Sequence, residues 1–149
     1  MVKGWDAVLR QKLAAAVAGF SRKGLSNKGL STKGIGDSAE DRALDYLQQQ
    51  GLRLLCRNYR LAGGPRQRGA EIDLILQDGD GTLVFVEVRA RRGTRHGGAA
   101  ASVLPSKQRR IVRAAQHYLM GLAEQPPCRF DVVAIDGESL QWLQGAFDS

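Results

Sequence analysis

Residues 71–89 read Glu71-Ile-Asp73-Leu-Ile75-Leu-Gln77, then the turn Asp78-Gly-Asp-Gly81, then Thr82 and Leu83-Val-Phe-Val-Glu87-Val-Arg89. Both arms alternate with a period of two and a glycine-containing turn joins them, so the segment predicts a β-hairpin. Alternation should give each arm two faces. On the first arm, one face is expected to carry Glu71, Asp73 and Ile75, and the other Ile72, Leu74 and Leu76. On the second arm, one face is expected to carry Phe85, Glu87 and Arg89, and the other Val84, Val86 and Val88.

The register of this hairpin determines where its acidic residues meet. If Gln77 pairs with Leu83 across the turn, Asp73 lies opposite Glu87 and Glu71 opposite Arg89. Carboxylates that face each other across a strand pair repel, and burying them unpaired among aliphatic residues is costly. A cation between them removes both costs, and carboxylate oxygens suit Mg²⁺ or Mn²⁺. The alternative is a salt-bridged ladder, in which Glu71 pairs with Arg89 and the other acids find arginines elsewhere.

The composition indicates one globular domain with a basic N-terminal arm. The chain has 149 residues, of which 43% are hydrophobic and 25% charged, which is ordinary for a globular protein with a substantial core. Its net charge of +7 is a property of residues 1–36, which hold seven basic residues and one acid. Residues 37–149 hold 15 basic and 14 acidic residues and are nearly neutral. The high isoelectric point alone therefore says little about a partner.

Within the domain the basic residues are clustered. Residues 89–113 hold eight basic residues and no acid, and residues 53–68 hold five arginines and no acid. Arginine grips phosphate with a planar fork, so these segments are candidate nucleic-acid contacts. An ordinary solvated surface is the other interpretation of the same charges.

Cysteine usage and hydropathy indicate a cytoplasmic protein. Cys56 and Cys128 lie far apart in the chain and form no metal-binding spacing, so neither zinc nor a disulfide framework is indicated. Free thiols fit a reducing compartment. The longest apolar run, residues 13–20, is too short to span a membrane, and no clean signal-peptide cleavage site follows it.

The arm, residues 1–36, combines an amphipathic segment with a short repeat. Apolar residues recur at helical spacing from Trp5 to Phe20 and predict a short amphipathic helix. Three pentapeptides of the form Ser-x-Lys-Gly-Leu/Ile follow, beginning at Ser21, Ser26 and Ser31. Glycine and serine at this density favour a flexible tether, whose lysines could contact phosphate without specificity.

The expected domain, residues 37–149, begins with a helix over residues 37–50. Asp37 resembles its N-cap, Glu40 the third residue of a capping box, and Gly51 its stop. Glu40 is also a candidate third carboxylate. Further strands are predicted over residues 52–59, 129–135 and 139–143. The order helix, three strands, helix, two strands predicts an α/β domain with a mixed sheet and helices on its faces.

The second helix is predicted to begin after Ser106, a suitable N-cap, and carries an apolar stripe over residues 111–122. Cations crowd its first two turns: Lys107, Arg109, Arg110 and Arg113. Cations near a helix N-terminus oppose the helix dipole, so they do not stabilise the helix. A bound anion would resolve this conflict.

Several motifs together resemble the small bacterial YraN-like family: Glu40, Glu71-Ile-Asp73-Leu-Ile75, Phe85-Val-Glu87-Val-Arg89-x-Arg91, Lys107, Ala114-Ala115-x-x-Tyr118-Leu119 and Arg129-Phe-Asp131. Members of that family are described as predicted endonucleases with the restriction-endonuclease-like PD-(D/E)XK fold, similar to archaeal Holliday-junction resolvases. The match covers residues 36–136 in the right order. The resemblance therefore implies a mixed central β-sheet flanked by helices and metal-dependent hydrolysis of phosphodiester bonds.

The resemblance also implies a role for individual residues. Asp73 and Glu87 would be the carboxylates that hold Mg²⁺ or Mn²⁺, and Glu40 a further ligand, direct or through water. Arg89 stands where the family motif has lysine and would complete the catalytic set, with Glu71 as its supporting neighbour. Lys107 would lie near the phosphate, and the basic segment supplies the other expected nucleic-acid contacts: Arg91, Arg92, Arg110 and Arg113.

The arginine at the motif position limits the mechanism. Arginine stays protonated and cannot accept a proton, so Arg89 can only orient and stabilise the phosphate. The attacking hydroxide must then come from a metal-bound water.

Three functions follow from the sequence. The first is a magnesium-dependent endonuclease, with DNA favoured over RNA, branched DNA as one candidate substrate, and a homodimer expected by analogy with resolvases. The second is a nucleic-acid-binding module of the same fold without catalysis. The third is docking of the amphipathic segment and the basic repeat on an anionic membrane surface or a partner.

Overall fold

The computed structural model describes residues 32–91 and 103–148, with side chains over 39–90 and 103–148. The amphipathic segment, most of the repeat and Arg92 lie outside the described residues, so the expected arm stays a prediction. The elements are α2 (Thr32–Gln49), β1 (Arg53–Leu61), β2 (Ala70–Gln77), β3 (Leu83–Arg91), α3 (Pro105–Met120), β4 (Cys128–Asp136) and β5 (Ser139–Phe147). The predicted order of helices and strands is confirmed.

The five strands form one mixed sheet in the order β1-β2-β3-β4-β5. All neighbouring strands are antiparallel except β3 and β4, which run parallel. A parallel pair needs a long crossover, and α3 lies in the connection between β3 and β4. The predicted mixed α/β architecture is thus confirmed. Neither described helix is both long and apolar enough to cross a bilayer.

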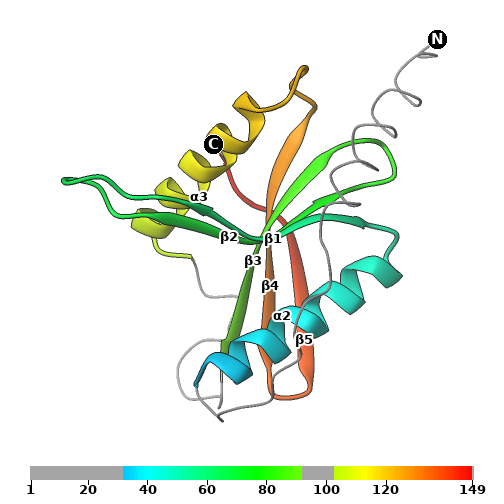
Figure 1. The fold of residues 1–149 in the computed structure, drawn as a ribbon. Helices are drawn as coiled ribbons and strands as arrows, with labels where there is room; N and C mark the ends of the chain where they lie inside the picture. The colour runs from blue at the N-terminus through cyan, green and yellow to red at the C-terminus, as the bar shows by residue number, and fades with distance from the viewer. Residues whose placement is uncertain (1–31, 92–102, 149) are drawn as a thin grey trace, which may run out of the picture. The chain divides into compact units, whose positions relative to one another are not determined.

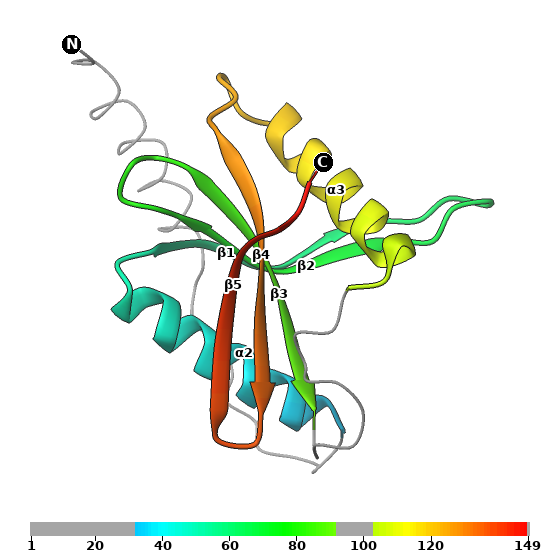
Figure 2. The ribbon, with the colours of Figure 1, turned by 180° about the vertical axis from the view of Figure 1, so that it is seen from behind.

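The two helices cover opposite faces of the sheet (Figures 1 and 2). On one face Ala43 and Leu47 of α2 pack with Leu74 of β2 and Val86 of β3. On the other face α3 contributes a second core: Ile111, Ala114 and Ala115, packed with Ile75, Phe85 and Val132. Apolar strand residues are therefore buried on both faces, and each helix owes its place mainly to the burial of its apolar stripe.

The predicted hairpin forms in the predicted register. Gln77 pairs with Leu83, and the β2–β3 ladder continues to Leu74 and Val86, where it ends. Beyond that point the first half of β2 stays with β1 and runs beside α3, while β3 continues along β4 (Figure 1). The sheet therefore opens between β2 and β3 at residues 73 and 87.

The predicted faces of β2 are wrong in their first half. Ile72 lies in the core under α3 together with Ile75, whereas Leu74 and Leu76 lie in the core under α2. Simple alternation puts Ile72 with Leu74. The physical reason lies in β1, where Asn58 has a φ of 51°. A left-handed residue breaks the pleat, so the two paired strands exchange faces at that point.

Both predicted helix starts are also wrong. Helix α2 begins at Thr32, so Asp37 lies inside it and is not the N-cap. Helix α3 begins at Pro105 after Leu104, without a side-chain cap, so Ser106 is not the N-cap. Proline suits the first position because its φ is already helical and its missing N–H would have no partner there.

A buried carboxylate fastens β5 to β4. Asp131 is fully buried and accepts hydrogen bonds from Arg129 Nε, Trp142 Nε1 and the Gly145 amide at 3.2, 2.9 and 3.0 Å. Burial lowers the pKa of Arg129, but its contacts with Asp78 and Asp131 outweigh that effect and raise it. Buried acids of this kind are stable only when their lone pairs are satisfied, and those of Asp131 are.

Candidate active site

Two carboxylates meet where β2 and β3 separate. Asp73 is the first residue of β2 beyond the ladder, and its Oδ2 accepts a hydrogen bond from the Val88 amide at 2.8 Å. The side chain thus satisfies a backbone donor of β3 at the opening in the sheet. Glu87 is the residue of β3 that follows Val86, where the same ladder ends, and it is 4% exposed. The predicted meeting of Asp73 and Glu87 is therefore present in the structure.

Their mutual repulsion changes the chemistry of Asp73. Burial and the charge of Glu87 raise the pKa of Asp73 to about 7, although the Val88 amide and the Lys107 ammonium oppose the rise. Aspartate normally ionises near pH 4. At neutral pH the site therefore holds a second negative charge only at a substantial electrostatic cost.

Lys107 reaches this site from α3. Its ammonium forms an ion pair with Oε1 of Glu87. The second oxygen of Glu87, Oε2, is buried and has no hydrogen-bond partner among the described residues. A buried carboxylate oxygen without a partner carries the full cost of desolvation. Lys107 thus neutralises one of the two charges that the carboxylate pair carries when Asp73 is ionised.

Glu40 occupies a different environment from the carboxylate pair. Its Oε2 lies 3.7 Å from Nη2 of Arg57, and the same guanidinium lies 2.8 Å from Asp41. Across residues 32–91 and 103–148 no three acidic, histidine or cysteine side chains form a group that could hold a metal ion. Of the three expected metal ligands, Asp73 and Glu87 therefore lie together, and Glu40 does not form a group with them.

The salt-bridged ladder between Glu71 and Arg89 is contradicted. Glu71 lies opposite Arg60 of β1, and Nε of Arg60 lies 2.9 Å from its Oε1. Because β2 pairs with β3 only from Leu74 onward, Glu71 has β1 as its neighbouring strand and forms its ion pair there. Arg89 is half-buried on β3, two residues beyond Glu87 and opposite Ala134 of β4.

The expected nucleic-acid contacts fall into three groups. Lys107 and Arg110 lie together on the first turns of α3, the former at the carboxylate pair. Arg113 instead donates a hydrogen bond to the carbonyl of Arg68 and supports the loop over residues 62–69. Arg91 is the last residue of β3, without a described side chain, and Arg92 lies outside the described part of the chain.

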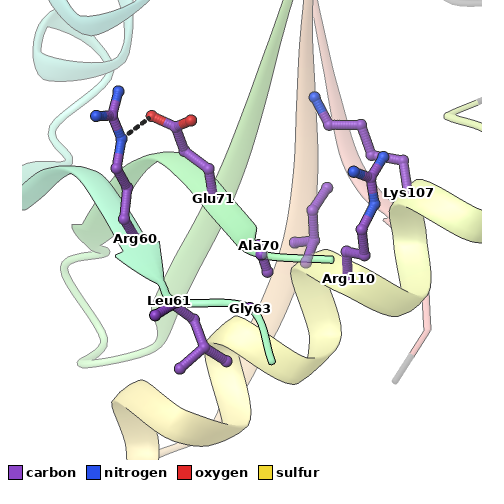
Figure 3. Close-up of a pocket in the computed structure, with 10 residues that line it drawn as sticks. Arg60, Leu61, Gly63, Ala70, Glu71, Lys107 and Arg110 are labelled. Carbon is purple, nitrogen blue, oxygen red and sulfur yellow. Dashed lines mark hydrogen bonds and ion pairs between the residues drawn. The ribbon is translucent and has the colours of Figure 1, made fainter. Parts of the chain in front are cut away.

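A hollow of about 520 Å³ adjoins the carboxylate pair, between the far end of the β1–β2 hairpin and the start of α3. Figure 3 shows the Arg60–Glu71 pair on one side and the side chains of Lys107 and Arg110 on the other. Gly63 and Gly69 keep the hairpin loop tight, because a Cβ at Gly63 would lie 2.5 Å from the Gln67 carbonyl oxygen. Sequence reasoning noted the arginine-rich segment 53–68 but did not single out Arg60 or this hollow.

Comparison with known proteins identifies the family. The sequence profile of the uncharacterised protein family UPF0102 matches residues 39–135. A UPF0102 protein of Methylibium petroleiphilum is 67% identical over 115 residues, covering 77% of this chain and 94% of the relative. UPF0102 proteins of Albidiferax ferrireducens and Cupriavidus taiwanensis are each 60% identical over 114 residues, which is 76% of this chain and 87% and 82% of theirs. The chain belongs to the UPF0102 family, and the resemblance to YraN-like proteins is confirmed at that level.

Proposed function

We propose that this protein is a metal-dependent nuclease that hydrolyses phosphodiester bonds of nucleic acid at the Asp73–Glu87 pair. The observation that carries the proposal is the half-neutralised state of that pair. Two acids share a site: Asp73 is partly buried and has its pKa raised to about 7, and Glu87 is buried and has an oxygen without a hydrogen-bond partner among the described residues. A protein that retains such an arrangement gains stability when a cation binds.

The donor set fits magnesium or manganese. Mg²⁺ retains several waters and is commonly held by one or two carboxylates together with substrate phosphates. Asp73 and Glu87 supply those two carboxylates, with Glu87 Oε2 available on the buried side. When bound, the ion would lower the pKa of a coordinated water and neutralise charge on the phosphate. A complete cage of protein ligands, including Glu40, is not needed for this role.

The residues around the pair have separate tasks in this proposal. The Val88 amide fixes the orientation of the Asp73 carboxylate. Lys107 forms an ion pair with Glu87 and brings a positive charge to the face that a phosphate would approach. Arg89 remains protonated, so it can hold a phosphate oxygen but cannot remove a proton. Lys107 contacts Glu87 directly, so we assign to Lys107 the task of the cation beside the carboxylate pair, although Arg89 stands at the position of the motif lysine.

The fold supports the same proposal. A mixed sheet with one helix on each face is the architecture that the resemblance to restriction-endonuclease-like proteins implied. The opening between β2 and β3 places Asp73 and Glu87 where the ladder between the two strands ends, instead of inside a continuous ladder. Fold alone is an argument by analogy, so the assignment of activity rests on the site.

One observation favours a nucleic-acid-binding module without catalysis. Lys107 already occupies one oxygen of Glu87, and an ammonium in that place can substitute for a metal ion. In such a protein the acids would be structural, and binding would fall steeply with salt while remaining indifferent to Asp73→Asn.

Metal binding separates the two functions. Titration calorimetry with Mg²⁺ and with Mn²⁺ compares the wild type with the Asp73→Asn/Glu87→Gln double variant, after circular dichroism has shown that both are folded. The nuclease proposal expects binding to the wild type and none to the variant, together with Mg²⁺-dependent cleavage of branched or linear DNA. No metal binding by the wild type, with or without an oligonucleotide, would leave the non-catalytic module as the function.

A further inference from the structure

We propose that the hollow between α3 and the β1–β2 hairpin binds one nucleotide of the substrate strand, next to the phosphodiester at the carboxylate pair. This inference rests on the proposed function, because it assumes that the pair acts on nucleic acid. It adds a second binding site, in which Arg110 would bind the phosphate of that nucleotide and Arg60 borders the same hollow.

The lining of the hollow has the chemistry of a nucleotide. Three cations border it, from two elements far apart in sequence: Arg60 from β1, and Lys107 and Arg110 from α3. Leu61 gives it an apolar part on which a sugar or base can lie. Arginine guanidinium groups bind phosphate oxygens through paired hydrogen bonds. A charged rim and an apolar wall together match a phosphate joined to a nucleoside.

The charges around the hollow are not balanced without a ligand. Glu71 also lines it, but its carboxylate is already paired with Arg60 across β1 and β2. Lys107 and Arg110 lie three residues apart on α3, and Figure 3 shows both extending from the same side of the helix. Like charges at this spacing repel. Lys107 is already paired with Glu87, so Arg110 is the cation of the hollow that an anion would neutralise.

The size of the hollow selects a nucleotide over a free phosphate. About 520 Å³ lies in the range of pockets that hold small organic ligands, and it is many times larger than one phosphate needs. Lys107 contacts Glu87 and also lines the hollow, so a single side chain links the two sites. A strand whose scissile phosphate lies at the carboxylates therefore reaches the hollow with a neighbouring nucleotide.

Arg110 and Arg109 offer a matched pair of substitutions on one helix. Arg110 lines the hollow, whereas Arg109 is the adjacent exposed residue with the same charge and does not. The full chain is titrated into a fluorescently labelled DNA oligonucleotide in EDTA, and affinity is read from fluorescence anisotropy at several salt concentrations. EDTA removes any metal-dependent contribution, and equal melting temperatures establish that the variants are folded.

The structure leads us to expect that Arg110→Gln weakens DNA binding by about tenfold or more and lowers the salt slope by about one, while Arg109→Gln changes affinity about twofold or less. Glu71→Gln frees Arg60 from its ion pair and should strengthen binding. Equal losses for Arg110→Gln and Arg109→Gln would overturn the site. Thymidine monophosphate should bind far more weakly than the oligonucleotide, and equal affinities would overturn its assignment to a strand.

The two proposals fail separately in this design. If the wild type cleaves DNA in Mg²⁺ but the two arginine variants bind alike, the nuclease stands and the nucleotide site is lost. If no condition gives cleavage but binding depends on Arg110 and not on Arg109, the nuclease fails and the nucleotide site remains.

Discussion

Replacing Asp73 by asparagine should stabilise the metal-free protein at alkaline pH. The folded-state pKa of Asp73 is about 7 and its ordinary value is 3.8, so the folded protein binds this proton more tightly than the unfolded chain. The free energy of unfolding of the wild type therefore falls as the pH rises from about 4 to about 7, and it stays low above that pH. Each pKa unit corresponds to about 1.4 kcal/mol, so the total loss is about 4 kcal/mol.

Asparagine cannot ionise, and its side-chain oxygen can still accept the hydrogen bond from the Val88 amide. Asp73→Asn should therefore recover up to about 4 kcal/mol at pH 8 in EDTA, which for a chain of this size corresponds to a rise in melting temperature of about 10 °C. Urea denaturation from pH 4 to pH 8 measures the effect. Asp45→Asn, on the exposed side of α2, is the control for a general loss of negative charge.

Magnesium should reduce the stability advantage of Asp73→Asn over the wild type. Binding to the folded state alone adds about 2.7 kcal/mol at a concentration one hundred times the dissociation constant. Wild type should gain this stability and Asp73→Asn should not. The reasoning is refuted if the stability of the wild type in EDTA does not fall between pH 4 and pH 8, or if Asp73→Asn is less stable than the wild type at pH 8.

Four further substitutions test other contacts. Lys107→Met leaves the buried Glu87 unpaired, so the free energy of unfolding in EDTA should fall by about 3 kcal/mol, and unchanged stability would contradict the ion pair. The variant should bind Mg²⁺ at least as tightly by calorimetry and should lose cleavage. Asp131→Asn breaks the buried network and should cost about 3–5 kcal/mol in urea denaturation followed by the fluorescence of Trp142, and a loss below 1 kcal/mol would count against that network. Arg89→Lys should keep or raise cleavage, and loss of cleavage in a folded variant would show that the guanidinium fork itself is needed. Gly145→Ala should cost about 1 kcal/mol in thermal unfolding, because the φ of 56° strains any residue with a Cβ.

The sequence predicted the hairpin and its register for a local physical reason. The turn between Gln77 and Leu83 is short, so the pairing next to it is fixed, and each following pair is then counted from the turn. Asp73 and Glu87 could therefore be brought together without a structure. The alternation of faces along β3 could also be predicted, because β3 pairs with β4 over its whole length and keeps a regular pleat.

The rest of the site depends on distant neighbours that local patterns do not encode. A strand pattern carries no sign that a left-handed residue at Asn58 will turn the outer half of β2. Nor does it show that β2 will pair with β3 only from Leu74 onward, so that Glu71 forms an ion pair with Arg60 instead of Arg89. These are properties of the pairing of three strands. The hollow, which is built from β1, the hairpin loop and α3, could not be predicted for the same reason.

The contrast between two buried acids separates a structural role from a functional one. Asp131 and Glu87 have nearly the same burial, and both belong to motifs that resemble the family. Asp131 has hydrogen-bond donors on both oxygens, from a guanidinium, an indole and a backbone amide. Glu87 has an ammonium on one oxygen, and its other oxygen has no hydrogen-bond partner among the described residues, beside a second carboxylate. The fold supplies hydrogen-bond donors to both oxygens of Asp131 but to only one oxygen of Glu87. This difference leaves room for a cation at Glu87 and is the reason that we assign the chemistry to Glu87 and Asp73.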